Sequence, residues 1–262
     1  MLLWRLECGD SPLIVSVPHA GRHVPDAIAL RMTPEARALP DTDWHVDELY
    51  RFAPATGATL VVATHSRYVV DCNRDPSGAA LYADADNTEL CPTRTFANDA
   101  IYVANEAPSQ NEIAARRATF FEPWHACVSA EIQRVRARHG YAVLLDGHSI
   151  AAEVPRFFAG RLPDLNLGTA DGRSCAASLQ ALAAGVLAGA TRFSHVVNGR
   201  FKGGYVTRSF GAPHAGVHAL QLEMVQDCYM NPWQPTLFDP ARARTIVALL
   251  ERLVIAVSEW RP

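Results

Sequence analysis

Two histidines follow two separate apolar runs, and their positions suggest a metal site. Residues 13–17 (Leu-Ile-Val-Ser-Val) are followed closely by His19, and residues 142–145 (Ala-Val-Leu-Leu) by His148. Each run has the length and composition of a buried strand. In α/β proteins, ligands bind at the carboxyl ends of such strands. We therefore expect His19 and His148 to bind one metal ion, although either histidine alone would be interpreted as an ordinary loop residue.

The third ligand is expected from the segment 41–47 (Asp-Thr-Asp-Trp-His-Val-Asp). A catalytic zinc usually has three protein ligands and an open position for water. Asp43 is the first candidate, Asp47 the second, and His45 a substitute. Acidic residues in the first turn of a helix also act as caps and dipole partners, which is the alternative interpretation.

Glu223 lies near the end of an expected central strand, residues 219–224. A buried charge is costly unless it has a partner or a function. One such function is that of a general base, which activates water beside a metal. The alternative is an internal ion pair with an arginine.

Asn73 and Arg74 follow another strand-like run and are candidates for binding a substrate carboxylate. A guanidinium binds a carboxylate through two parallel hydrogen bonds, a geometry that lysine cannot match. The amide of Asn73 could add a donor. A structural salt bridge from Arg74 to Asp71 or Asp75 is the alternative.

The segment 198–208 combines three cations with three glycines. Glycine permits close approach of the backbone to a ligand. Arg200, Lys202 and Arg208, with no acidic residue between them, are therefore candidates for binding a small anionic substrate. A solvated turn is the alternative.

The elements that must position these residues alternate along the chain. Strands are expected at 13–17, 59–63, 68–71, 142–145, 157–159, 195–197 and 219–224, and helices at 43–55, 111–138 (with a break or kink at Pro123), 174–188 and 240–260. The short turn between the second and third strands suits antiparallel neighbours. The irregular segment 75–109 has the length of a functional loop. Together these elements predict an α/β three-layer αβα sandwich with a mixed, mostly parallel central sheet.

Composition narrows the classes of protein and partner. The 262 residues are 49% hydrophobic and 19% charged, as in ordinary globular proteins, and are expected to form one domain over 1–262. The net charge of −3, without a basic stretch, argues against nucleic acid as the main partner. No apolar run has the length of a membrane span, and no signal peptide is evident. The six scattered cysteines suit reduced thiols rather than disulfides or a cysteine zinc site, so a cytoplasmic protein is expected.

Six short motifs resemble those of N-formylglutamate amidohydrolases, in the same order along the chain. They are Pro18-His19-Ala20-Gly21, Asp41-Thr42-Asp43-Trp44, Asp71-Cys72-Asn73-Arg74, Asp146-Gly147-His148-Ser149, Phe201-Lys202-Gly203-Gly204-Tyr205 and Gln221-Leu222-Glu223. The resemblance extends from about residue 11 to about residue 235. It implies a fold like that of the zinc carboxypeptidases, also described as phosphorylase/hydrolase-like.

The resemblance also implies roles for single residues. His19 matches the first metal histidine and His148 the last, with zinc as the metal. Asn73-Arg74 resembles the pair that binds a substrate carboxylate, and Glu223 matches the glutamate that activates water.

One position departs from the related zinc carboxypeptidases. Those enzymes have a glutamate ligand three residues after the first histidine, where this chain has Arg22. The third ligand must therefore come from elsewhere in the chain.

The expected activity is zinc-dependent hydrolysis of N-formyl-L-glutamate to L-glutamate and formate, a late step of histidine degradation. One alternative is a metal-dependent amidohydrolase or carboxypeptidase-like enzyme for another N-acyl amino acid or a short peptide. Another is a metal-free module that binds anions.

Overall fold

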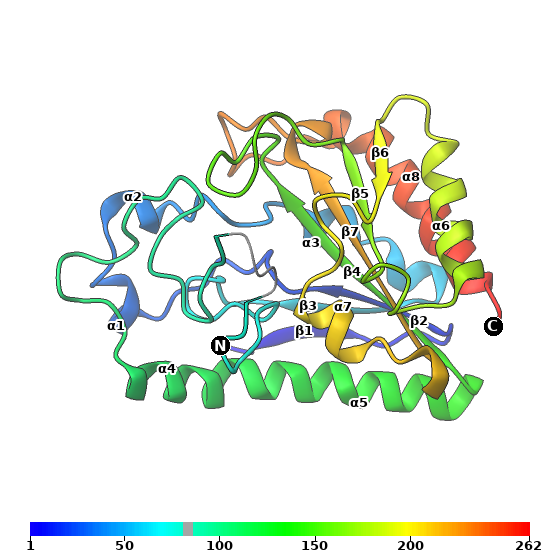
Figure 1. Cartoon of the computed structure of the whole chain (residues 1–262), viewed down its shortest axis with the longest axis horizontal. Coiled ribbons are helices and arrows are strands. Elements are labelled where there is room, and N and C mark those ends of the chain that lie inside the picture. The colour runs from blue at the N-terminus through cyan, green and yellow to red at the C-terminus, as the bar shows by residue number, and fades with distance from the viewer. Residues whose placement is uncertain (81–85) are drawn as a thin grey trace.

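Seven strands form one mixed sheet in the computed structural model, which describes residues 1–80 and 86–262 (Figure 1). The strands are β1 (Trp4–Glu7), β2 (Leu13–Val17), β3 (Thr59–Ala63), β4 (Ala142–Ile150), β5 (Leu165–Gly168), β6 (His195–Val197) and β7 (Val217–Val225). Their order across the sheet is β1-β3-β2-β4-β7-β5-β6. The pairs β2/β3, β2/β4, β4/β7 and β5/β6 are parallel, and β1/β3 and β5/β7 are antiparallel. The expected mixed, mostly parallel sheet is confirmed.

Helices cover both faces of this sheet, which explains why its strands read as continuous apolar runs. Leu145 packs into a core with α6 (Ala177–Ala188) and α8 (Pro240–Glu259). Its neighbour Leu144 faces the other way and packs with α5 (Glu122–His139). Figure 1 shows α5 along one side of the sheet and α6 with α8 on the other, so the fold is the expected three-layer sandwich.

The long helical region is interrupted just before Pro123, as expected. A π-helical turn, η2 (Arg117–Phe121), joins α4 (Gln110–Arg116) to α5. Proline lacks the backbone N–H that would close the preceding α-helical turn, and a π-turn is one way for a helix to accommodate this.

Three expected elements are wrong. Residues 68–71 are not a strand: they form a turn in which the Val69 N–H donates to the Ser66 carbonyl at 2.9 Å. Residues 157–159 are likewise a turn. The helix expected at 43–55 is shorter, because α3 (Val46–Leu49) begins only after His45, whose φ of 64° is outside the helical range.

The sequence patterns missed other elements. The antiparallel pairs that make the sheet mixed are β1/β3 and β5/β7, rather than the pair expected at 59–63 and 68–71. The remaining helices are α1 (Asp26–Ala29), α2 (Pro34–Arg37), α7 (Tyr205–Phe210) and the 3₁₀ turns η1 (Ala53–Thr56), η3 (Pro213–Ala215) and η4 (Gln226–Cys228). None of the helices in the described residues has the length and apolar character needed to cross a bilayer.

Candidate active site and metal centre

The site lies where the central parallel strands end. His19 follows β2 by two residues, whereas His148 lies inside β4, which continues to Ile150 instead of stopping at Asp146. The parallel register of β4 and β7 pairs His148 with Glu223. Three strands that are distant in sequence, β2, β4 and β7, thus bring polar side chains together near their carboxyl ends.

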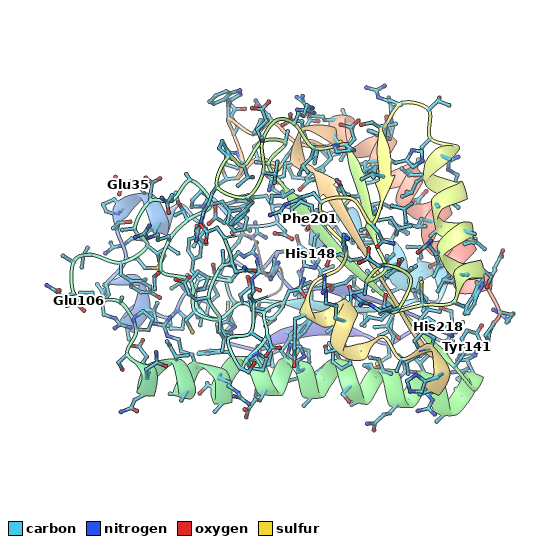
Figure 2. All side chains as sticks on the ribbon, in the orientation of Figure 1. Glu35, Glu106, Tyr141, His148, Phe201 and His218 are labelled. Carbon is cyan, nitrogen blue, oxygen red and sulfur yellow. The ribbon has the colours of Figure 1, made fainter. Side chains whose placement is uncertain are left out.

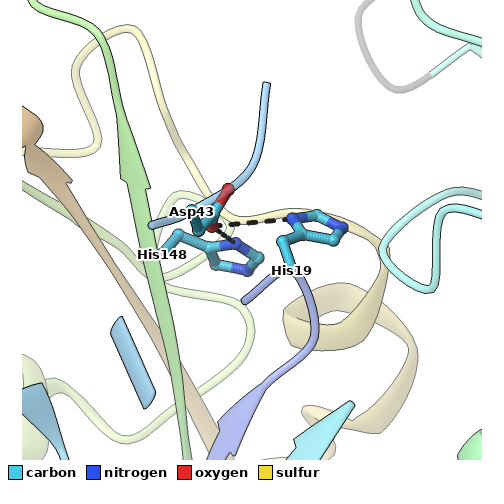
Figure 3. Close-up of side chains that lie close together, drawn as sticks. All are labelled: His19, Asp43 and His148. Atoms are coloured by element: carbon cyan, nitrogen blue, oxygen red, sulfur yellow. Dashed lines mark hydrogen bonds and ion pairs between the residues drawn. The ribbon is translucent and has the colours of Figure 1, made fainter. Parts of the chain in front are cut away.

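His19, Asp43 and His148 form a buried cluster (Figure 3). One ligand atom from each lies within 4.8 Å of the others. The Asp43 Oδ2 atom is 3.0 Å from the His148 Nδ1 atom and 3.7 Å from the His19 Nδ1 atom. Ligand atoms around a tetrahedral zinc are separated by roughly 3.3 Å. Two imidazoles and a carboxylate at this spacing therefore fit a zinc-like ion.

A second carboxylate orients each histidine. The His19 Nε2 atom is 2.7 Å from the Asp71 Oδ1 atom, and the His148 Nε2 atom is 2.7 Å from the Asp146 Oδ2 atom. A proton on Nε2, donated to the carboxylate, leaves the Nδ1 lone pair directed into the cluster. Metal-binding histidines commonly have such an outer partner, which fixes their tautomer and ring orientation.

The backbone around Asp43 holds its side chain between the histidines. The Asp43 N–H donates to the His19 carbonyl at 3.1 Å, and the Ser149 N–H donates to Asp43 Oδ2 at 3.1 Å. Arg67 donates to the other carboxylate oxygen at 3.4 Å. Asp43 is therefore positioned by both strands that carry the histidines.

The two other candidates for the third ligand point elsewhere. Asp47 forms an ion pair with Arg5, with 2.6 Å between its Oδ2 atom and the guanidinium. The His45 Nε2 atom is 2.8 Å from the Pro235 carbonyl. Arg22, which occupies the position of the glutamate ligand in zinc carboxypeptidases, stacks its guanidinium over the Trp44 ring at 5.8 Å.

Buried negative charge surrounds the cluster. Asp43, Asp71, Asp146 and Glu223 are each at most 7% exposed, and the buried Arg67 donates to both Asp43 and Asp71. Burial alone would raise the pKa of Asp43, but the adjacent imidazoles lower it below its usual range. Burial would lower the pKa of His148, but Asp146 and Asp43 raise it well above its usual range. The site therefore attracts positive charge, which a divalent cation would supply.

Glu223 is a buried carboxyl group in the same pocket. Burial raises its pKa to about 8, and the neighbouring His148 opposes that effect. The Gln221 Nε2 atom is 3.3 Å from the Glu223 Oε2 atom. A carboxyl group with a pKa near neutrality suits proton transfer in both directions.

The pocket is open to a substrate and is polar at one part of its wall and aromatic at another. Its empty volume is about 650 Å³, including solvent space at the mouth. Asn73, Arg74 and Arg200 line it together with the cluster and Glu223. Phe201 also lines it, and Figure 2 shows Phe201 close to His148 at the centre of the molecule.

The predicted anion-binding residues separate into two groups. Arg74 lines the pocket and donates from Nε to Thr88 Oγ1 at 2.6 Å, while its distance to Asp71 is 4.0 Å. Lys202 and Arg208 do not line the pocket. Lys202 lies 3.1 Å from Asp171, and Arg208 donates to the Gly203 carbonyl at 2.8 Å.

Some residues of the site were not expected from the sequence. Asp146 and His148 are two residues apart on one strand, so the two-residue period of a strand could have paired them. No sequence pattern indicated Arg67, which lies in a turn and donates to Asp71 at 2.8 Å. Gln221 was part of a recognised motif but had no assigned role.

Comparisons with known proteins identify the family of this chain. A family model described as N-formylglutamate amidohydrolase matches residues 11–230. The chain belongs to the N-formylglutamate amidohydrolase family. Two curated members of the family, the N-formylglutamate deformylases of Pseudomonas putida and Pseudomonas aeruginosa, are each 42% identical to it over 252 residues. The matches cover 96% of this chain and 94% of each relative.

A solved structure of the family gives the same result. The N-formylglutamate amidohydrolase from Ralstonia eutropha JMP134 matches with a TM-score of 0.83 at 25% identity, covering 99% of this chain and 98% of that one. The resemblance to N-formylglutamate amidohydrolases that the six motifs suggested is thereby confirmed.

Proposed function

We propose that this protein hydrolyses N-formyl-L-glutamate to L-glutamate and formate with the help of a bound zinc ion. The observation that carries the proposal is the buried cluster of His19, Asp43 and His148 beside Glu223, in one pocket with the cationic Arg74. The names of the relatives with 42% identity support the choice of substrate.

His19, Asp43 and His148 are the proposed ligands of the zinc ion. A zinc ion held there would polarise the formyl carbonyl and lower the pKa of an attacking water to about 7. His19 and His148 would be neutral in this state, and the outer carboxylates would keep their Nδ1 atoms directed at the ion.

Glu223 is the proposed general base and acid. Its carboxylate would accept the proton of the attacking water and then deliver it to the nitrogen of the leaving glutamate. The elevated pKa of the buried carboxyl group, about 8, favours the first transfer because it makes the carboxylate a stronger base, and the value is close enough to neutrality for the group to release the proton again.

Asn73, Arg74 and Arg200 are the proposed ligands of the two substrate carboxylates. Arginine suits this role because its planar guanidinium can bind both oxygens of a carboxylate. Holding the substrate at its carboxylates would fix the scissile amide against the metal site and so supply orientation.

The test is a comparison of metal-depleted and zinc-reconstituted protein on N-formylglutamate, N-acetylglutamate and N-formylalanine. We expect turnover to return when one zinc per chain is restored, and to be fastest on N-formylglutamate. Faster turnover of another N-acyl amino acid would favour the related amidohydrolase. Glutamate binding without zinc and without turnover would favour the anion-binding module.

We place the enzyme in the cytoplasm, in the pathway of histidine degradation.

A further inference from the structure

Gln221 makes two buried hydrogen bonds that fix the direction of its amide. Its Oε1 atom accepts from the Gly204 N–H at 2.7 Å, and its Nε2 atom lies 3.3 Å from Glu223 Oε2. The Gly204 N–H can only donate, so the oxygen of the amide must face it and the nitrogen must face the carboxylate. Gln221 therefore donates to Glu223.

The strand geometry places the two side chains close enough for this contact. Gln221 and Glu223 are two residues apart on β7, so their side chains leave the same face of the sheet. In the parallel register of β4 and β7, Asp146 lies opposite Gln221 and His148 opposite Glu223. The amide of Gln221 is thus a neutral donor among three acidic or metal-directed side chains.

The oxygen end of the Gln221 amide contacts Gly204, which lines the pocket together with Asn73. Gly204 packs so closely on Asn73 that a Cβ atom on Gly204 would lie 2.3 Å from the Asn73 Nδ2 atom. The start of α7 holds the Asn73 side chain as well, because the Val206 N–H donates to Asn73 Oδ1 at 2.8 Å. Asn73 Nδ2 also lies 3.0 Å from His148 Nε2; this is a packing contact between two donors, because that Nε2 atom donates its proton to Asp146.

We propose that Gln221 is a positioning residue: it orients the Glu223 carboxylate and, through Gly204, keeps the base in register with Asn73. The inference rests on the proposed function, because it assigns a role relative to the general base. Gln221 is 3% exposed and also lines the pocket, so its amide has no role as a solvent-exposed surface group.

The experiment is a double-mutant cycle on the zinc-loaded enzyme, with Gln221→Met, Glu223→Gln and the combination. Methionine has similar length but provides neither hydrogen bond. Gln221→Met should lower kcat about tenfold to a hundredfold, a part of what a general base contributes. It should also weaken glutamate binding measured by calorimetry, with zinc content unchanged. In the Glu223→Gln background the same change should cause no further loss of kcat.

The control is Ser174→Ala, which removes another buried hydrogen bond to the strand that carries Glu223. Ser174 Oγ donates to the Ala219 carbonyl at 2.8 Å, and neither residue lines the pocket. The Ser174→Ala variant should have lower thermal stability and an unchanged kcat. Losses of kcat that multiply independently in the Gln221 cycle would overturn the positioning role. A wild-type enzyme that is inactive on N-formylglutamate would contradict the proposed function and, with it, the role of Gln221.

Discussion

His148 and Glu223 are register partners on adjacent parallel strands, β4 and β7. This pairing places a proposed metal ligand and the proposed base side by side without any loop between them. Asp146 and Gln221 form the neighbouring pair in the same register. Asp146 orients His148, and Gln221 donates a hydrogen bond to Glu223. The relative position of His148 and Glu223 is therefore set by the pairing of the two strands.

Asp43 and Asp47 provide a matched pair of substitutions for the third ligand. Asp43→Asn should lose zinc, because an amide is a poor zinc ligand and because the carboxylate lies between the two histidines. Asp47→Asn should keep one zinc per chain, since Asp47 pairs with Arg5. Elemental analysis of the two purified proteins measures this. Equal zinc retention in both would show that the third ligand lies elsewhere.

Asp146→Asn tests the outer carboxylate of His148. The amide cannot replace the charge that orients the imidazole and makes it more basic. Zinc affinity, measured by competition with a chelator, should fall about tenfold to a hundredfold while the fold is retained. Unchanged affinity would mean that the contact between Asp146 and His148 does not support metal binding.

Arg74→Lys tests recognition of the substrate carboxylate. Lysine keeps the positive charge but cannot form two parallel hydrogen bonds, so kcat/KM on N-formylglutamate should fall at least about tenfold, with zinc content normal. Lys202→Met is the comparison, because Lys202 lies against Asp171 outside the pocket and should change kcat/KM little. The opposite ranking would assign carboxylate binding to Lys202 rather than to Arg74.

His125 makes stability depend on pH. Burial lowers the pKa of His125 to about 4, whereas the unfolded chain retains a value near 6.5. Below pH 6.5 the unfolded chain binds a proton that the folded protein does not, so this contribution to the free energy of unfolding falls from pH 6.5 to about 4. The loss is on the order of 3 kcal/mol.

The measurement is denaturant unfolding of wild type and His125→Gln at several pH values. The stability advantage of the wild type should shrink as the pH falls from 7 to 4, because glutamine does not titrate. An advantage that stays constant over that range would show that His125 is not held neutral by the fold.

The central part of the fold could be predicted from the sequence because its strands are covered on both faces. The strands β2, β3 and β4 are buried along their whole length, which gives them apolar runs, and His19 and His148 come shortly after the apolar runs of β2 and β4. The edge strand β1 and the antiparallel β5 were missed. They are only four residues long, and β1 is mostly exposed, so their composition resembles that of a loop.

The site was less predictable where long-range contacts override local patterns. Residues 68–71 have the composition of a strand, but they follow a turn that ends with Asp71 in contact with both His19 and Arg67. The choice between Asp43 and Asp47 could not be made from spacing in an expected helix, because the helix begins only after His45. Only the three-dimensional packing of the segment against β2 and β4 separates these two carboxylates.

The kinetics of Glu223→Gln are the direct test of whether Glu223 is the general base. Glutamine keeps the shape of the side chain but cannot accept the proton of water. We expect a loss of at least about a hundredfold in kcat, with one zinc per chain retained, glutamate still bound and stability not reduced. A zinc-loaded Glu223→Gln enzyme with near-normal kcat on N-formylglutamate would contradict the account.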